Sequence, residues 1–140
     1  MKFILKVCAG GVMTKFENPS PELIEHAIET IRPMYDNFII LDPEDLLEDC
    51  RFMQTAISLK KDTTVLEYIV ELQFAYGEAE IAKGKLFTQY QTLVGDVSVV
   101  KRLFRMFALG IVPDCRTWND ITQDMLDEWA EQRKAREAEK

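Results

Sequence analysis

Three runs of apolar and alternating residues in the middle of the chain constrain its fold more than any other feature. Residues 38–41 read FIIL, and two longer runs follow at residues 51–58 and 64–72, with turn-forming residues between them. In the last run Glu67 and Glu71 alternate with branched and aromatic residues. Runs of this length and period are typical of strands that pair antiparallel. The middle of the chain therefore predicts an antiparallel sheet.

The sheet is expected to extend on both sides of this region. Residues 2–8 and 12–17 are strand-like runs that flank Gly10 and Gly11, which predicts a hairpin. Residues 85–93 alternate again and predict a further strand.

The segment 74–82 carries two opposing signals. Its Ala and Glu residues favour a helix, but Gly77 and Gly84 bracket a run that is too short for a stable helix. We therefore expect this segment to be a strand.

Two amphipathic helices have clear boundary signals. The first spans residues 21–31 and follows Ser20, a good N-terminal cap. The second spans residues 97–109, with Asp96 as its cap and Gly110 just after its end. The apolar residues of each helix fall on one stripe, so we expect both helices to pack against the sheet.

The second helix has two unlike sides. Phe104 and Phe107 lie on its apolar stripe, and we expect them to be buried against the sheet. Lys101, Arg102 and Arg105 gather on the other side. We expect this basic side to be solvated, because nucleic-acid binding needs more phosphate contacts and stacking aromatic side chains.

A third helix is predicted near the end of the sequence, with Thr122 as its cap. Its apolar stripe ends at Trp129 and is continued only by Arg133 and Arg136. Residues 133–140 are therefore expected to form a solvated helical or frayed tail. Trp129 stands where the apolar neighbours end, and a partly exposed Trp in such a place can anchor a protein contact.

These elements predict an α+β fold: a mostly antiparallel sheet of five or six strands, two amphipathic helices packed on it, and a C-terminal helix. A length of 140 residues and a hydrophobic content of 47% suit one domain. We place this domain at residues 1–132, before the tail. A chain of this size buries enough surface to fold without a disulfide or a metal.

Charge and cysteine content narrow the function classes. The net charge of −7 argues against binding to nucleic acid or an anionic membrane and leaves a basic protein open as a partner. No apolar run approaches the roughly 20 residues of a membrane span, and Lys6 interrupts the first run, so we expect no secretion signal. Cys8, Cys50 and Cys115 are widely spaced, which predicts free thiols in a cytoplasmic protein and no zinc site.

Catalytic motifs are absent from the sequence. His26, the single histidine, lies at the edge of a polar helix side, four residues after Glu22, and is expected to be a solvent-exposed residue. The sequence has no GxSxG elbow, no phosphate loop and no dinucleotide fingerprint. We therefore expect a protein that is not an enzyme and uses no cofactor.

The strongest local charge pattern is the acidic run at residues 42–49. It reads DPEDLLED and contains no basic residue, and the spacing of a calcium loop is absent. Two interpretations stay open: a solvated connection between strands, or a patch that steers a basic protein toward it. The candidate binding residues are the carboxylates of this run together with the exposed tryptophan: Asp42, Glu44, Asp45, Glu48, Asp49 and Trp129.

The order of several segments resembles a known group of proteins. The helix beginning PSPELIEHAIETI is followed by NFIIL, FMQTA and VLEY, and later VVKRLFRMFALG precedes RTWNDIT. Over residues 18–121 this order resembles small bacterial proteins related to the immunity proteins of polymorphic toxin systems. The resemblance implies a cytoplasmic protein that binds and neutralises a cognate toxin and has no catalytic residue.

We therefore predict a non-enzymatic protein-binding module of the immunity type, which neutralises a toxin by occlusion. Two alternatives stay open: a small enzyme whose site is assembled from scattered residues, and a phage-type structural or interaction protein. A concave pocket with convergent polar groups would favour the enzyme, and a flat surface carrying the acidic run would favour the binder. The oligomeric state is also open, a homodimer included.

Overall fold

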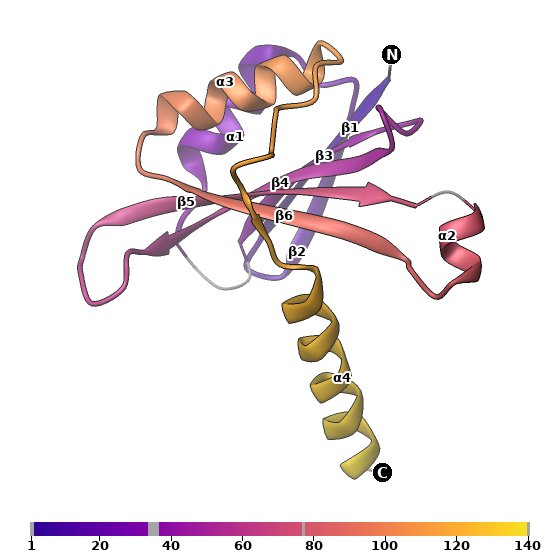
Figure 1. The fold of residues 1–140 in the computed structure, drawn as a ribbon. Helices are drawn as coiled ribbons and strands as arrows, with labels where there is room; N and C mark the ends of the chain where they lie inside the picture. Colours follow the sequence, from indigo (N-terminus) through magenta and orange to yellow (C-terminus); the bar gives the residue numbers. More distant parts are fainter. Residues whose placement is uncertain (1, 34–36, 77, 140) are drawn as a thin grey trace.

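The computed structural model describes residues 2–33, 37–76 and 78–139 (Figure 1). Within these residues the chain forms one antiparallel sheet and four helices, so the predicted α+β fold is confirmed. The elements are β1 (Phe3–Ala9), β2 (Val12–Glu17), α1 (Pro21–Thr30), β3 (Phe38–Pro43), β4 (Cys50–Leu59), β5 (Leu66–Ala75), α2 (Glu78–Ala82), β6 (Phe87–Val94), α3 (Val97–Ala108), β7 (Asn119–Asp120) and α4 (Thr122–Ala138).

The strands are ordered β2-β1-β3-β4-β5-β6-β7, and each neighbouring pair is antiparallel. The predicted hairpin joins β1 to β2 through Gly10 (φ 59°) and Gly11 (φ 82°), a left-handed backbone that glycine adopts readily. The described residues form seven strands, slightly more than predicted. The addition is β7, two residues that pair with Tyr90 and Gln91 of β6.

Helices α1 and α3 lie side by side on one face of the sheet, which we call the closed face (Figure 1). Ser20 caps α1 by accepting a hydrogen bond from the N–H of Leu23 at 3.1 Å, and Asp96 caps α3 by accepting from the N–H of Ser98 at 2.9 Å. Gly110 follows α3 with a φ of 89°. Both predicted caps are therefore confirmed.

Ion pairs join these two helices across their solvent side. Lys101 of α3 pairs with Glu29 of α1, and Arg105 of α3 pairs with Glu25 of α1. The prediction that the basic side of α3 contacts only solvent is therefore wrong for Lys101 and Arg105. Helix α1 lies alongside α3, and its acidic residues pair with these two side chains. Arg102 is exposed.

The hydrophobic core lies between the closed face and these two helices. One row of buried side chains crosses four strands, because its members are opposite one another in register: Leu5, Leu41, Met53 and Leu72. Alternate residues of these central strands join the core, such as Phe3 and Leu5 of β1, Ile39 and Leu41 of β3, and Val70 and Leu72 of β5, as the pleat of a strand requires.

Helix α3 contributes the largest fully buried side chains. Phe104 and Phe107 have no exposed surface, and the ring of Phe107 meets that of Phe3 edge-on, with ring centroids 5.8 Å apart. The predicted burial of both residues is therefore confirmed. Rings of this size remove a large apolar area from water, so α3 has one stable orientation on the sheet.

The strand predicted for residues 74–82 is wrong. Phe74 and Ala75 end β5, Glu78–Ala82 forms the short helix α2, and Gly77 lies outside the described residues. Strands β5 and β6 pair with each other along the whole of β6. The residues that connect them therefore cannot insert into the sheet as a further strand between the two. The helix propensity of Ala and Glu then decides the conformation, because β5 and β6 fix the two ends of the connection.

Helix α4 leaves the sheet on the other face, which we call the open face (Figure 1). The predicted Thr122 cap is wrong: Thr122 is the first helical residue, and its Oγ1 accepts a hydrogen bond from the N–H of Gln89 at 2.9 Å. Thr122 therefore ties α4 to β6 instead of capping it. Residues 130–138 are helical and exposed. None of the described helices is long and apolar enough to cross a membrane.

Candidate functional site

The acidic run at residues 42–49 connects β3 to β4. Asp42 lies within β3 and forms an ion pair with Lys6 of β1, its neighbour in the sheet. Its charge is therefore compensated inside the protein. The remaining carboxylates of the run are on exposed residues: Glu44, Asp45, Glu48 and Asp49.

The end of the acidic run is a tight turn. Leu47 and Cys50 exchange two backbone hydrogen bonds of 3.1 and 2.7 Å, and Glu48 and Asp49 between them have left-handed φ values of 48° and 67°. Glutamate adopts this conformation only at some energetic cost. The carbonyl of Asp49 also accepts a hydrogen bond from the N–H of Ala75 at 2.8 Å. The turn is thus held beside the end of β5.

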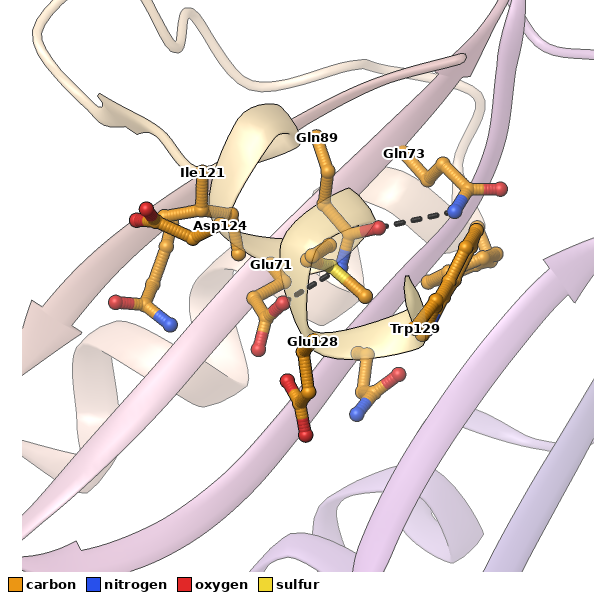
Figure 2. A pocket seen from close by; sticks show the side chains of 11 residues that line it. Glu71, Gln73, Gln89, Ile121, Asp124, Glu128 and Trp129 are labelled. Carbon is orange, nitrogen blue, oxygen red and sulfur yellow. Dashed lines mark hydrogen bonds between the residues drawn. The ribbon is translucent and has the colours of Figure 1, made fainter. Parts of the chain in front are cut away.

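A hollow of about 580 Å³ lies between the open face and the first turns of α4 (Figure 2). Strands β4, β5 and β6 each contribute two side chains to its floor, because alternate residues of a strand point to the same face. We call it the α4 hollow, and its lining consists of Phe52, Gln54, Glu71, Gln73, Gln89, Gln91, Ile121, Asp124, Met125, Glu128 and Trp129.

Trp129 is the one predicted site residue that lines the α4 hollow. Its ring lies against that of Phe87, with ring centroids 5.2 Å apart, and 39% of the residue is exposed. The predicted partial exposure of Trp129 is therefore confirmed. The five carboxylates of the acidic run lie outside the lining, so the structure does not bring the predicted site residues together.

Side-chain amides organise the floor of the α4 hollow (Figure 2). Gln73 donates from Nε2 to Oε1 of Gln89 at 2.9 Å, and Gln89 donates from Nε2 to Oε1 of Glu71 at 2.6 Å. Arg51 reaches Oε1 of Gln73 with a longer hydrogen bond of 3.4 Å. Gln89 is only 2% exposed, so this chain of hydrogen bonds fixes the position of the Glu71 carboxylate.

The α4 hollow is negatively charged. Glu71, Asp124 and Glu128 line it, and its lining contains neither Lys nor Arg. Burial raises the pKa of the Glu71 carboxyl, the amides of Gln89 and Gln91 lower it, and the negative charge of Glu128 raises it. Among the described residues, Glu71 forms no ion pair. A half-buried carboxylate without a cation is costly to the fold and is a frequent mark of a binding site.

Other reactive groups are not gathered at this hollow. His26 is exposed on α1. Burial raises the pKa of the Cys50 thiol to about 12, so this thiol stays protonated and unreactive. Across residues 2–33, 37–76 and 78–139, no group of three His, Cys, Asp or Glu side chains could hold a metal ion.

The floor of the α4 hollow was not predicted from the sequence, although a partial signal is present. Gln54, Glu71, Gln89 and Gln91 lie on predicted strands, at positions that alternate with apolar or smaller residues, and Gln73 directly follows the strand predicted at 64–72. Such a pattern indicates a face that is turned away from the core. It does not reveal that α4 returns to this face, because that depends on the path of the chain after α3.

Comparisons with known proteins add no identification. No protein-family model, no curated protein and no solved structure matches the chain. The geometry of the α4 hollow is therefore the basis for a functional proposal.

Proposed function

We propose that the protein is a non-enzymatic module that binds a basic protein, and that the α4 hollow is the contact that recognises it. One observation carries the proposal: a concave surface beside a partly exposed Trp129 is lined by Glu71, Asp124 and Glu128, with no basic side chain in its lining. A basic side chain of a partner would compensate these charges. Clefts lined by charges of one sign attract ligands of the opposite sign.

The acidic run supports the same class of partner. Glu44, Asp45, Glu48 and Asp49 are exposed, and the strand that follows them carries Phe52 into the lining of the α4 hollow. Exposed charges at the border of a contact mainly raise the association rate. We therefore assign the acidic run to steering and the α4 hollow to recognition.

Trp129 supports a protein as the ligand. Tryptophan is enriched among the few residues that dominate the energy of protein interfaces. Its position at the edge of the hollow leaves part of its ring open to a protein that also reaches into the hollow.

Neutralisation of a toxin by occlusion is the form of this function that we propose. It rests on the resemblance of residues 18–121 to immunity proteins and on the net charge of −7. A toxin that cuts nucleic acid binds phosphates in a basic cleft, and carboxylates can occupy such a cleft in their place. Binding alone then blocks the toxin, so no catalytic residue is required.

The proposal is tested with the basic proteins encoded beside this one in its genome. Each is purified, and its association with the immobilised protein is measured at roughly 50 mM and 300 mM salt. We expect one of them to bind, with an association rate that falls severalfold at the higher salt concentration. Asp124→Asn with Glu128→Gln should accelerate its dissociation. Glu131→Gln with Glu137→Gln, on the exposed part of α4, is the matched control and should change nothing.

A variant of the acidic run tests the steering role. Glu44, Asp45, Glu48 and Asp49 are changed together to Asn or Gln, which should slow association severalfold at low salt and leave folding intact. Binding that is insensitive to salt and to both sets of variants would refute the proposal. So would the absence of binding to every basic neighbour.

A second candidate function is supported by the concave shape of the hollow and the raised pKa of Glu71. Convergent polar groups around a carboxyl of raised pKa are also typical of acid–base catalysts. The discriminating measurement is a screen of nitrophenyl esters, glycosides and phosphates with wild type and Glu71→Gln. Hydrolysis that is lost in Glu71→Gln and kept in Glu67→Gln would favour the enzyme over the binding module.

A further inference from the structure

We infer that the α4 hollow receives a guanidinium group, the end of an arginine side chain of the partner, with Glu71 as its counter-ion and Trp129 as its aromatic wall. This inference rests on the proposed function and specifies the chemical group that the hollow recognises. It follows from the charge, the size and the shape of the lining.

The first step is that the ligand carries positive charge. Glu71 is held in place by Gln89, which donates to its Oε1 at 2.6 Å, and no described residue forms an ion pair with it. A carboxylate can accept about four hydrogen bonds, so acceptor positions are left for a donor that enters the hollow. Figure 2 shows the carboxylates of Glu71 and Glu128 directed to the same part of the hollow. A cation placed there would meet both.

The second step is that the floor is prepared for binding before the ligand arrives. Gln89 is almost fully buried and is itself held by Gln73 at 2.9 Å. The carboxylate therefore needs no large rearrangement to accept a ligand, and pre-organisation of this kind favours affinity. This distinguishes the α4 hollow from the acidic run, whose carboxylates other than Asp42 lie on exposed residues.

The third step is that the cation is organic. A volume of about 580 Å³ is far more than a bare metal ion fills and lies in the range of sites for organic groups. The described residues also contain no metal-binding group of three His, Cys, Asp or Glu side chains. A side chain of several heavy atoms fits the hollow better on both counts.

The fourth step favours guanidinium over ammonium. The lining combines the acceptors of Glu71 and Glu128 with the flat rings of Phe52 and Trp129. A guanidinium group is planar, offers five N–H donors and stacks on aromatic rings, while an ammonium group is a compact and strongly hydrated charge. Arginine therefore matches both the polar and the aromatic parts of the lining.

The experiment titrates the ¹⁵N-labelled protein with N-acetyl-arginine amide and follows its NMR spectrum. The indole N–H of Trp129 and the side-chain amides of Gln73, Gln89 and Gln91 report on the hollow directly. N-acetyl-citrulline amide, which has nearly the same shape and no charge, is the matched ligand control. N-acetyl-lysine amide tests the preference for guanidinium.

We expect the arginine amide to shift these four signals in a saturable way. The citrulline amide should bind at least tenfold more weakly, and the lysine amide severalfold more weakly. Glu71→Gln should weaken arginine binding at least tenfold, while Glu67→Gln, which removes the same charge from the same face of β5 outside the hollow, should change it less than twofold. Glu128→Gln, on the exposed helix, provides a second variant that leaves the floor unchanged.

Equal binding of arginine and citrulline amides would overturn the inference, as would unchanged binding in both Glu71→Gln and Glu128→Gln.

The proposed function can fail or hold independently of the guanidinium inference. If a basic neighbour binds with a salt-dependent rate and the arginine amide does not shift the hollow, the guanidinium inference fails and the binding module stands. If the arginine amide binds as expected and no basic protein does, the inference stands and the proposed function fails.

Discussion

The two faces of the sheet are built from the same strands but carry different side chains, apolar on one face and mostly polar on the other. On the closed face, residues such as Leu41 and Leu72 are fully buried beneath α1 and α3. On the open face, strands β4, β5 and β6 carry Gln54, Glu71 and Gln89, and only the beginning of α4 lies over these side chains. The closed face is filled by apolar side chains, and the open face leaves a polar hollow.

This difference shows that the side chains that stabilise the fold are not the ones best suited to bind a ligand. Apolar side chains stabilise the fold in proportion to the area that they remove from water, and their contacts need no particular orientation. Buried amides and carboxylates stabilise it only when each donor and acceptor has a partner. On the open face Gln73 donates to Gln89 and Gln89 donates to Glu71, but Glu71 forms no ion pair with any described residue. A ligand can therefore gain more on the open face than on the closed face.

The largest effect is expected from the closed face. Phe107→Ala should lower the free energy of unfolding by about 3–5 kcal/mol, because it leaves a cavity in a fully buried site. The matched change on the open face, Phe52→Ala, removes a half-buried ring and should cost less than about 2 kcal/mol. Denaturant unfolding followed by circular dichroism measures both. Equal losses would mean that the open face contributes to the core as much as the closed face.

The next effect concerns the amide chain of the open face. Gln89→Ala should cost about 1–3 kcal/mol, since it leaves Gln73 and Glu71 without their buried partner. Gln54→Ala, in the same lining but half-buried, is the control and should cost less than about 1 kcal/mol. The same unfolding measurement applies. A loss at Gln89 no larger than that at Gln54 would show that the hydrogen-bond chain does not support the hollow.

A smaller effect depends on pH. Burial raises the pKa of the Glu71 carboxyl in the folded protein above its value in the unfolded chain. The contribution of Glu71 to the free energy of unfolding is therefore most favourable at a pH below its pKa in the unfolded chain. It is lost as the pH rises through its pKa in the folded protein. Glu71→Gln cannot ionise and so avoids this loss of stability. The melting temperature of the variant should exceed that of wild type at about pH 7 and approach it at about pH 4, near the ordinary pKa of glutamate. Glu67→Gln controls for the lost charge. A lower melting temperature for Glu71→Gln at the higher pH would show that the ionised carboxylate is stabilised by the fold.

The smallest effect is expected from the end of α4. Removal of residues 133–140 should change the free energy of unfolding by less than about 0.5 kcal/mol, because residues 133–139 are exposed and no apolar stripe continues past Trp129. Thermal melts at two protein concentrations measure this. A drop of several degrees, or one that depends on concentration, would show that the end of α4 docks on the domain or on a second copy.

The closed face could be predicted from the sequence almost in full. The apolar stripes of residues 97–109 and the alternation in residues 64–72 are local patterns, and burial follows from them directly. The capping roles of Ser20 and Asp96 are equally local, since a cap acts within three residues of itself. The strand predicted at 74–82 failed because its conformation is imposed by the two strands that it connects.

The candidate site could be predicted only in part. Trp129 was found because it ends an apolar stripe, and the acidic run because charge is visible in a sequence. The α4 hollow joins Glu71, Gln73 and Gln89 from two strands with Glu128 from a helix that follows them by dozens of residues. Their meeting depends on the pairing of β5 with β6 and on the Thr122 contact that fixes α4 to β6.

The sequence by itself determined the α+β class, the two amphipathic helices and the apolar side of the sheet, because local periodicity is set by the geometry of one element at a time. Only the tertiary structure decided where α4 lies, that Lys101 and Arg105 pair with α1, and that Glu71 forms no ion pair with a described residue. Those outcomes depend on contacts between residues far apart in the chain. No local pattern encodes such contacts, because each side chain finds its partner only after the strands have paired and the helices have packed.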